Sequence, residues 1–168
     1  ERVARLAYRL ATALSLPETD ARLVELAGRL HDIGKIGVRE SVLNKPGPLT
    51  PEEFEHVKQH PSLGAQILEP IAEDPRLIEA VLHHHEKWDG TGYPHGLQGD
   101  EIPLLAQILK VADVYEALTS NRPYRPARSP REASRIMREE IGTGLPPEIT
   151  QVFLGLLELA SPSPLEPR

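Results

Sequence analysis

Histidines and carboxylates gather at a few points along this chain in a pattern typical of metal ligands. Neutral imidazole nitrogens combined with carboxylate oxygens suit iron, manganese, zinc or nickel better than calcium or magnesium. Six candidates are too many for one metal ion and about right for two. Two metals a few ångströms apart are the usual device for in-line attack of hydroxide on phosphorus, so the pattern predicts a metal-dependent phosphohydrolase. The candidates are His31, Asp32, His60, His84, His85 and Asp113.

Each part of this pattern also has an ordinary explanation. A His-Asp pair such as His31-Asp32 occurs by chance in many proteins. The consecutive histidines 83–85 could form a solvated patch or bind metal adventitiously. A single histidine such as His56 is more often a hydrogen-bonded structural residue than a ligand. Taken together, the clusters favour a metal site over these ordinary explanations, because they fall on separate predicted helices beside a glycine-rich loop.

Basic residues near these clusters could contact phosphate. Lys35 lies one turn beyond the first His-Asp pair and could offer a point charge, although a lysine there also complements a helix dipole. Arg122 and Arg125 follow the segment that carries Asp113. A guanidinium can hold two phosphate oxygens at once, although arginines are common on surfaces. The two glycines of the loop 89–94 let backbone approach a ligand, but the loop could equally be an ordinary surface loop.

Composition predicts one ordinary globular domain within the 168 residues, of which 39% are hydrophobic and 26% charged. The net charge of −6 argues against binding to polymeric nucleic acid, which favours a basic surface. Without cysteine, both disulfides and thiolate metal sites are excluded. We found no signal peptide and no apolar run long enough for a membrane span, so we expect a cytoplasmic protein. A start inside an apparent helix, without Met, predicts a fragment of a longer protein.

Apolar periodicity and helix-capping motifs predict an all-α compact bundle of about seven or eight helices, with the dimetal site in its core. In this scheme His31 and Asp32 end the second helix, which Gly34 and Gly37 close, and His60 ends the third. The predicted domain covers residues 1–160, and three prolines predict a flexible tail over 161–168. The expected helices begin near residue 2 and at Pro17, Pro51, Pro61, Pro75, Pro103, Pro130 and Pro147.

Three ordered blocks of the sequence resemble a known family. The block His31-Asp32-Ile33-Gly34-Lys35 is similar to the signature of the HD superfamily of metal-dependent phosphohydrolases. Residues 84–94, His-His-Glu-Lys-Trp-Asp-Gly-Thr-Gly-Tyr-Pro, resemble the signature of its HD-GYP branch. Residues 112–120 and 122–125 match the next block of that branch. The resemblance extends from about residue 2 to residue 155.

The resemblance implies a phosphodiesterase that hydrolyses cyclic di-GMP, a bacterial second messenger, to the linear dinucleotide, with GMP as the alternative end product. The family uses two or three divalent metals, most often iron or manganese, and zinc or nickel would also fit. One metal would take His31, Asp32 and Asp113. The second would share Asp32 as a bridge and add His60, His84 and His85.

The resemblance also assigns roles to residues around the metals. Lys35, Arg122 and Arg125 match positions that contact substrate phosphates, and Tyr93 matches a position that lines the substrate pocket. Asp32 and Lys35 are the expected catalytic residues, Asp32 as the metal bridge and Lys35 by offsetting charge that develops on phosphorus.

Other functions fit the same residues. The substrate could be another cyclic dinucleotide or a nucleotide phosphate. Alternatively, the chain is a catalytically inactive regulatory module that senses the nucleotide or docks a diguanylate cyclase through its Gly-Tyr-Pro loop. Such a module would bind nucleotide without turnover, even with added manganese or ferrous iron. Because family members are usually output domains, we expect an upstream sensor or receiver domain. Homodimers are common in such domains, but the sequence does not decide this.

The family pattern is not matched everywhere. Glu116 stands where many members have Asp, which keeps the charge and should matter little. A further ligand histidine on the family's first helix, and a glutamate of three-metal members, would lie upstream of Glu1. The first metal would thus lack a ligand in this chain, whereas the second keeps its full set.

We therefore expect residues 1–168 to hold the second metal more tightly than the first. Metal counting by native mass spectrometry at limiting metal should reveal one strong and one weak position in this centre. Equal filling of the two positions would contradict the predicted asymmetry.

Overall fold

The described part of the chain, residues 1–121 and 126–160 of a computed structural model, is helical. It contains no strand, only two isolated β-bridges. The all-α prediction is confirmed, and apart from the single turn α3 the helices within these described ranges number eight. Arg122, Arg125 and the predicted tail 161–168 lie outside the described residues. The helices are α1 Arg2–Ala13, α2 Glu18–Leu30, α3 Glu40–Leu43, α4 Pro51–Val57, α5 His60–Leu68, α6 Pro75–His83, α7 Leu104–Thr119, α8 Pro130–Glu139 and α9 Pro147–Ala160, with 3₁₀ turns η1 Ile33–Gly37 and η2 Gly99–Glu101.

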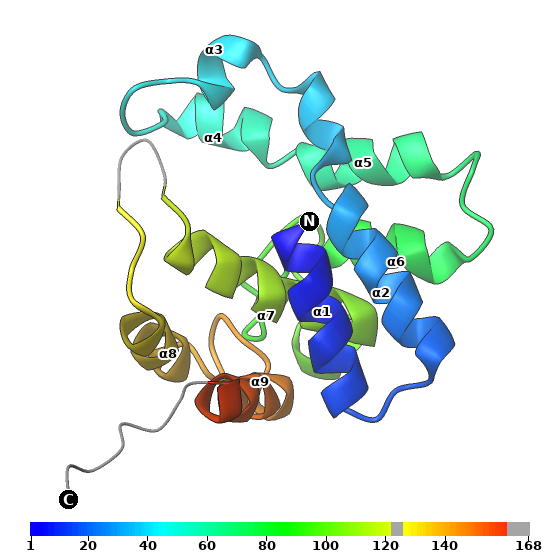
Figure 1. Cartoon of the computed structure of the whole chain (residues 1–168). Coiled ribbons are helices and arrows are strands. Elements are labelled where there is room, and N and C mark those ends of the chain that lie inside the picture. Colours follow the sequence, from blue (N-terminus) through cyan, green and yellow to red (C-terminus); the bar gives the residue numbers. More distant parts are fainter. Residues whose placement is uncertain (122–125, 161–168) are drawn as a thin grey trace, which may run out of the picture.

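Helix α7 is the centre of the bundle. It packs against α1, α2, α6, α8 and α9 (Figure 1). Its residues Ile108, Leu109, Val111 and Ala112 are completely buried, which is why this helix is apolar around most of its circumference. Any polar side chain that α7 carries is therefore held against a packed core.

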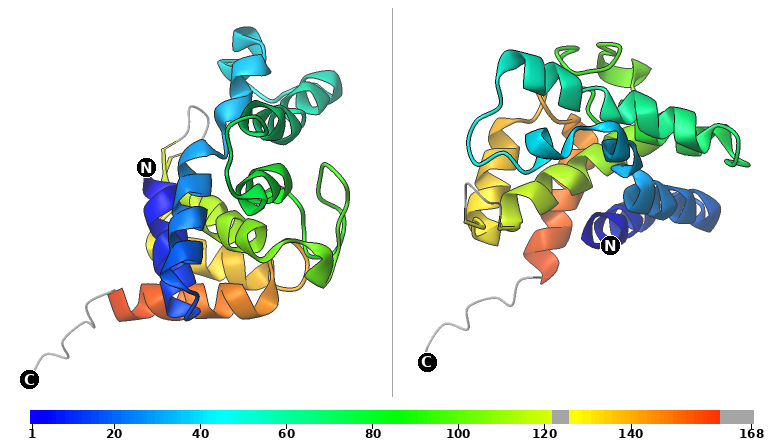
Figure 2. Two further views of the ribbon diagram at one scale, coloured as in Figure 1. Left: turned by 90° about the vertical axis from the view of Figure 1, so that its right-hand side faces the viewer. Right: turned by 90° about the horizontal axis from the view of Figure 1, so that it is seen from above.

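The remaining helices are arranged around this centre. Helices α1 and α2 lie side by side, and a Cβ at Gly28 would stand only 2.7 Å from the Ala4 Cα, so the two backbones approach closely. Figures 1 and 2 show α3 and α4 at one end of the molecule and α8 and α9 at the other. Helix α5 packs against α6 and η1. Within the described residues, no helix is long and apolar enough to cross a membrane.

Capping motifs fix where the helices around the candidate site begin, as predicted. At α4, the Thr50 hydroxyl accepts a hydrogen bond from the Glu53 N–H at 3.2 Å, and the Glu53 carboxylate accepts from the Thr50 N–H at 2.7 Å. This reciprocal box satisfies two donors that a helix start leaves free. At α6, Asp74 accepts from the Arg76 N–H at 2.9 Å.

Two local predictions were wrong. His60 does not end a helix: α4 ends at Val57, and His60 is the first residue of α5. Pro61 favours this arrangement, because a proline fits the first turn of a helix, where its missing N–H is not needed. Gly34 and Gly37 do not close α2 either, since α2 ends at Leu30 and both glycines lie in η1.

Position 34 requires glycine because η1 approaches α5 closely there. A Cβ at this position would lie 1.9 Å from the His60 carbonyl oxygen and 2.5 Å from the Gly64 nitrogen. The contact fixes Asp32, two residues earlier, relative to His60. Only glycine is small enough to allow it.

We expect Gly34→Ala to destabilise the fold by about 3 kcal/mol or more, because overpacking against rigid backbone cannot be relieved by a side-chain rotation. Urea denaturation of the metal-free protein measures this. Gly155→Ala is the matched control: the site has open space in a helix, so the change should raise stability by up to about 1 kcal/mol. An unchanged denaturation midpoint for Gly34→Ala would contradict the close approach.

Candidate metal centre

The six residues proposed as metal ligands come together from four parts of the fold. His31 caps the C-terminus of α2 and Asp32 follows it, His60 opens α5, His84 caps α6 and His85 follows it, and Asp113 lies on α7. His60 and His84 are fully buried. The centre thus lies where helix ends meet the apolar central helix.

Asp32 lies between the two halves of the centre. Its Oδ2 is 3.5 Å from the His31 Nε2, whereas its Oδ1 is 3.6 Å from the His60 Nε2. On the other side, the Asp113 Oδ1 is 3.6 Å from the His31 Nε2. Two ligands bonded to one metal at about 2.1 Å stand roughly 3.4 Å apart in tetrahedral geometry, so each spacing suits a shared cation.

Backbone carbonyls determine which nitrogen of each ring faces the centre. The Nδ1 atoms of His31, His60 and His84 lie 2.9, 2.8 and 2.6 Å from the carbonyl oxygens of Gly28, Val57 and Val81. A carbonyl can only accept, so each Nδ1 carries the proton and each Nε2 presents a lone pair. Ligand histidines in metalloproteins are held in this way.

The unpaired ring nitrogens provide a test of whether a metal fits. The Nε2 atoms of His60 and His84 are buried and have no hydrogen-bond partner. Ligand atoms of His60, His84 and His85 lie within 4.8 Å of one another. A buried lone pair without a partner is costly, and a metal ion would satisfy both. The donor set fits a transition metal.

Charges within the centre act on the imidazoles in opposite directions. Burial alone would lower the pKa of His31, but Asp113 and Asp32 outweigh it and raise the pKa. Burial likewise works against ionisation of Asp113, yet the neighbouring imidazoles, His31 foremost, lower its pKa. Burial lowers the pKa of His84 to about 3 and also lowers those of His60 and His85. The last three are thus neutral, which is the form that binds metal.

Two further predicted residues border the centre. The Lys35 Nζ lies 2.7 Å from Asp32 Oδ2, so its charge is already directed at the central carboxylate. The Tyr93 ring stacks on His85, with centroids 4.9 Å apart and an interplanar angle of 22°. Burial, then Asp113 and Asp32, raises the pKa of Tyr93 to about 12, so the phenol remains a hydrogen-bond donor at neutral pH. Arg122 and Arg125 lie outside the described residues.

Sequence reasoning missed two lysines at this site. The Lys110 Nζ is 3.4 Å from the carbonyl oxygen of His85, and burial lowers its pKa to about 8. The signal was present: Lys110 interrupts an apolar helix three residues before Asp113, on the same face. The Lys58 Nζ lies 5.5 Å from the centroid of the Tyr93 ring. Lys58 could not be recognised in this way, because it follows the largely polar helix α4, where a charged residue is ordinary.

The role of Glu86 was also missed. This fully buried carboxylate accepts hydrogen bonds from the N–H groups of His95 at 2.8 Å and Gly96 at 3.1 Å. The loop that contains Gly92 also contacts the backbone just after α6. A Cβ at Gly92 would lie only 2.2 Å from the Lys87 nitrogen. Glu86 therefore attaches the Gly-Tyr-Pro loop to the end of α6.

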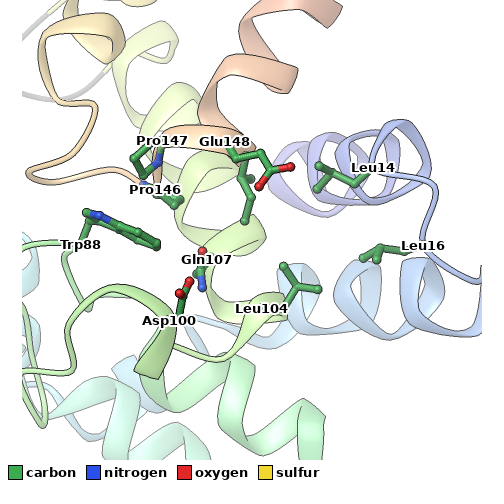
Figure 3. A pocket seen from close by; sticks show the side chains of 10 residues that line it. Leu14, Leu16, Trp88, Asp100, Leu104, Gln107, Pro146, Pro147 and Glu148 are labelled. Atoms are coloured by element: carbon green, nitrogen blue, oxygen red, sulfur yellow. The ribbon is translucent and has the colours of Figure 1, made fainter.

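A separate pocket of about 260 Å³ lies elsewhere, between the α1–α2 turn and the start of α9 (Figure 3). It is lined by Trp88, Gln107 and several leucines and prolines, and by the carboxylates of Asp100 and Glu148. It contains none of the six clustered ligands. Because it offers no cationic side chain, it is a poor site for a phosphate group.

Comparison with protein families identifies the architecture around these ligands. Residues 1–149 match the HD domain family. This chain belongs to that family. The resemblance recognised in the sequence is thus confirmed.

Curated relatives support the same assignment. A cyclic di-GMP phosphodiesterase of Thermotoga maritima is 43% identical over 159 residues, covering 93% of this chain and 43% of the relative. A cyclic di-GMP phosphodiesterase of Pseudomonas aeruginosa is 45% identical over 153 residues, covering 90% of this chain and 37% of the relative. A 3'3'-cGAMP-specific phosphodiesterase of Vibrio cholerae is 41% identical over 148 residues, covering 88% and 32%. The chain thus spans about two fifths or less of these relatives.

Solved structures show the same fold. An HDG"Y"P protein from Bdellovibrio bacteriovorus superposes with a TM-score of 0.74 at 24% identity, over 94% of this chain and 50% of that one. A cyclic GMP-AMP-specific phosphodiesterase of V. cholerae gives a TM-score of 0.73 at 17% identity, over 94% and 43%. The helical arrangement is therefore that of an HD domain.

We expect the metal-free domain to lose stability as the pH falls from 6.5 to 5. His84 and His85 stay neutral when folded, and the pKa of His60 is lowered too, but all three take up protons below about pH 6.5 when unfolded, so the unfolded state binds more protons. Their contribution is present above pH 6.5 and is lost on acidification. His84 alone accounts for about 2 kcal/mol across this window.

His31 acts with the opposite sign, because its raised pKa makes its contribution fullest below pH 6.5. The three lowered groups outnumber it. Denaturation with urea in EDTA at both pH values measures the difference, and equal free energies of unfolding would contradict the neutral state of the buried imidazoles.

Proposed function

We propose that this chain is the catalytic domain of a metal-dependent phosphodiesterase that hydrolyses cyclic di-GMP to the linear dinucleotide, with GMP as the alternative end product. The observation that carries the proposal is the placement of Asp32 between His31 and His60, with the buried Nε2 atoms of His60 and His84 unpaired. Two metals are proposed there, with iron or manganese preferred. His31, Asp32 and Asp113 would hold one, and Asp32, His60, His84 and His85 the other.

When bound, two divalent metals supply Lewis-acid activation of a phosphodiester and of the attacking water. Backbone carbonyls hold His60 and His84 with the proton on Nδ1, so that no proton has to leave their Nε2 atoms before binding. Lys35 has three donors and uses one on Asp32, which leaves it able to donate to a substrate phosphate beside that carboxylate. Tyr93 would donate its O–H to the nucleotide. Arg122 and Arg125 are proposed phosphate contacts on the resemblance alone.

The substrate class follows from the relatives. Those named as cyclic di-GMP phosphodiesterases match at 42–48% identity, and three named as specific for 3'3'-cGAMP match at 35–41%. Cyclic di-GMP is therefore the first candidate and 3'3'-cGAMP the second. Both are rings closed by two phosphodiesters, so either would present the same reacting group.

The setting of the domain is part of the proposal. A bacterial cytoplasmic location, an upstream sensor or receiver, a diguanylate cyclase docked at the Gly-Tyr-Pro loop and a homodimer are all proposed on the family resemblance. None is needed for the chemistry of the centre.

The deciding experiment is anaerobic purification with metal analysis, followed by incubation with cyclic di-GMP or 3'3'-cGAMP and chromatography of the products. Appearance of the linear dinucleotide supports the proposal, and the preferred substrate separates the two candidates. Nucleotide binding without turnover, in the presence of manganese or ferrous iron, would favour the regulatory module instead.

We expect Asp32→Ala to reduce turnover to a few per cent of the original or less. Loss of a residue that merely supports a ligand costs about 10- to 100-fold, and a carboxylate shared by two metals should cost more. The control is His56→Ala, which removes a histidine outside the centre and should keep most activity. Circular dichroism checks that both variants fold. A folded Asp32→Ala variant with substantial activity would remove the bridging role.

A further inference from the structure

A second group of potential metal ligands lies beside the proposed centre but outside it. His83 precedes His84, and because successive helical residues point about 100° apart, it faces another direction. It faces Glu86 and His95: its Nδ1 is 3.5 Å from a Glu86 oxygen, and its ring centroid is 5.2 Å from that of His95. One ligand atom from each of these three residues lies within 4.8 Å of the others.

We propose that His83, Glu86 and His95 form an auxiliary site for a zinc-like divalent cation. Two imidazoles and one carboxylate are a donor set that zinc takes with its fourth position left to water. His83 and Glu86 are buried, whereas His95 is exposed, so the fourth position can reach solvent. The site uses none of the six residues of the proposed catalytic centre.

The spacing supports ligation over a simple hydrogen bond. At 3.5 Å, the His83–Glu86 contact is longer than the 2.7–3.2 Å of ordinary N–H···O bonds. It is close to the edge of about 3.4 Å between two ligands of a tetrahedral zinc. The carboxylate can serve both purposes, because each oxygen accepts one backbone N–H and retains a second lone pair.

Such a cation would hold the Gly-Tyr-Pro loop. His83 ends α6, and His95 lies in the loop just after Tyr93 and Pro94. A bond from each to one metal would reinforce the attachment that Glu86 already provides. The loop would then be held by a cation that takes no part in hydrolysis, so the inference does not depend on the proposed activity.

The test uses the absence of cysteine from the sequence. In a His95→Cys variant, cobalt(II) added beyond the amount that fills the proposed catalytic centre should produce a thiolate-to-cobalt charge-transfer band in the near ultraviolet, which only a Cys–metal bond gives. His56→Cys is the matched control and should give no band, since His56 is the one histidine outside both groups. A His95→Cys variant that is saturated with cobalt(II) and still lacks the band would overturn the site.

A zinc count addresses the native residues. After equilibrium dialysis at fixed free zinc, the unaltered protein should hold one more zinc per chain than His95→Ala, while His56→Ala should hold the same number as the unaltered protein. Equal counts for His95→Ala and the unaltered protein would leave Glu86 as a purely structural anchor and overturn the proposal. Neither readout involves turnover, so failure here is distinct from failure of the phosphodiesterase assay.

Discussion

The centre depends on hydrogen bonds between histidine rings and backbone carbonyls at helix ends. The last carbonyls of a helix have no partner within it, so a side chain just beyond the end can donate to them. His31 and His84 do so at the ends of α2 and α6, and His60 does so to the last residue of α4. Each bond fixes a tautomer and aims a lone pair. The same helix ends carry partial negative charge, which favours a cation where they meet.

Two carboxylates and two lysines determine the charge of the proposed metal centre. Asp32 and Asp113 bring negative charge to the metal centre, which is surrounded by buried residues. Burial makes an unpaired charge costly there. In the metal-free protein, Lys35 offsets that charge, and the two carboxylates in turn raise the pKa of His31. Lys110 adds a further cation beside Asp113, with a pKa lowered to about 8 because burial works against its charge.

Features that depend on neighbouring residues, such as helix starts and ligand types, could be predicted from the sequence. Helix starts followed from capping residues such as Thr50 and Asp74, and the ligand types defined the site. The features that could not be predicted depend on contacts with backbone that is distant along the chain. Gly34 resembled a helix terminator, but its actual constraint is the His60 carbonyl, 26 positions away along the chain. The links of Glu86 to His95 and of Lys58 to Tyr93 depend on how the loop folds back, which no local pattern encodes.

The same reasoning places substrate choice outside the metal centre. Cyclic di-GMP and 3'3'-cGAMP differ in one base, whereas their ring phosphates are alike, so ligands that act on the phosphate cannot tell them apart. Relatives specific for 3'3'-cGAMP nonetheless match this chain at up to 41% identity, close to the 43% of the Thermotoga relative. Discrimination must therefore come from groups that reach the bases. Tyr93 and Lys58 border the centre without being among its proposed ligands, so we propose them as residues that meet the bases, with Glu86 attaching the loop that carries Tyr93.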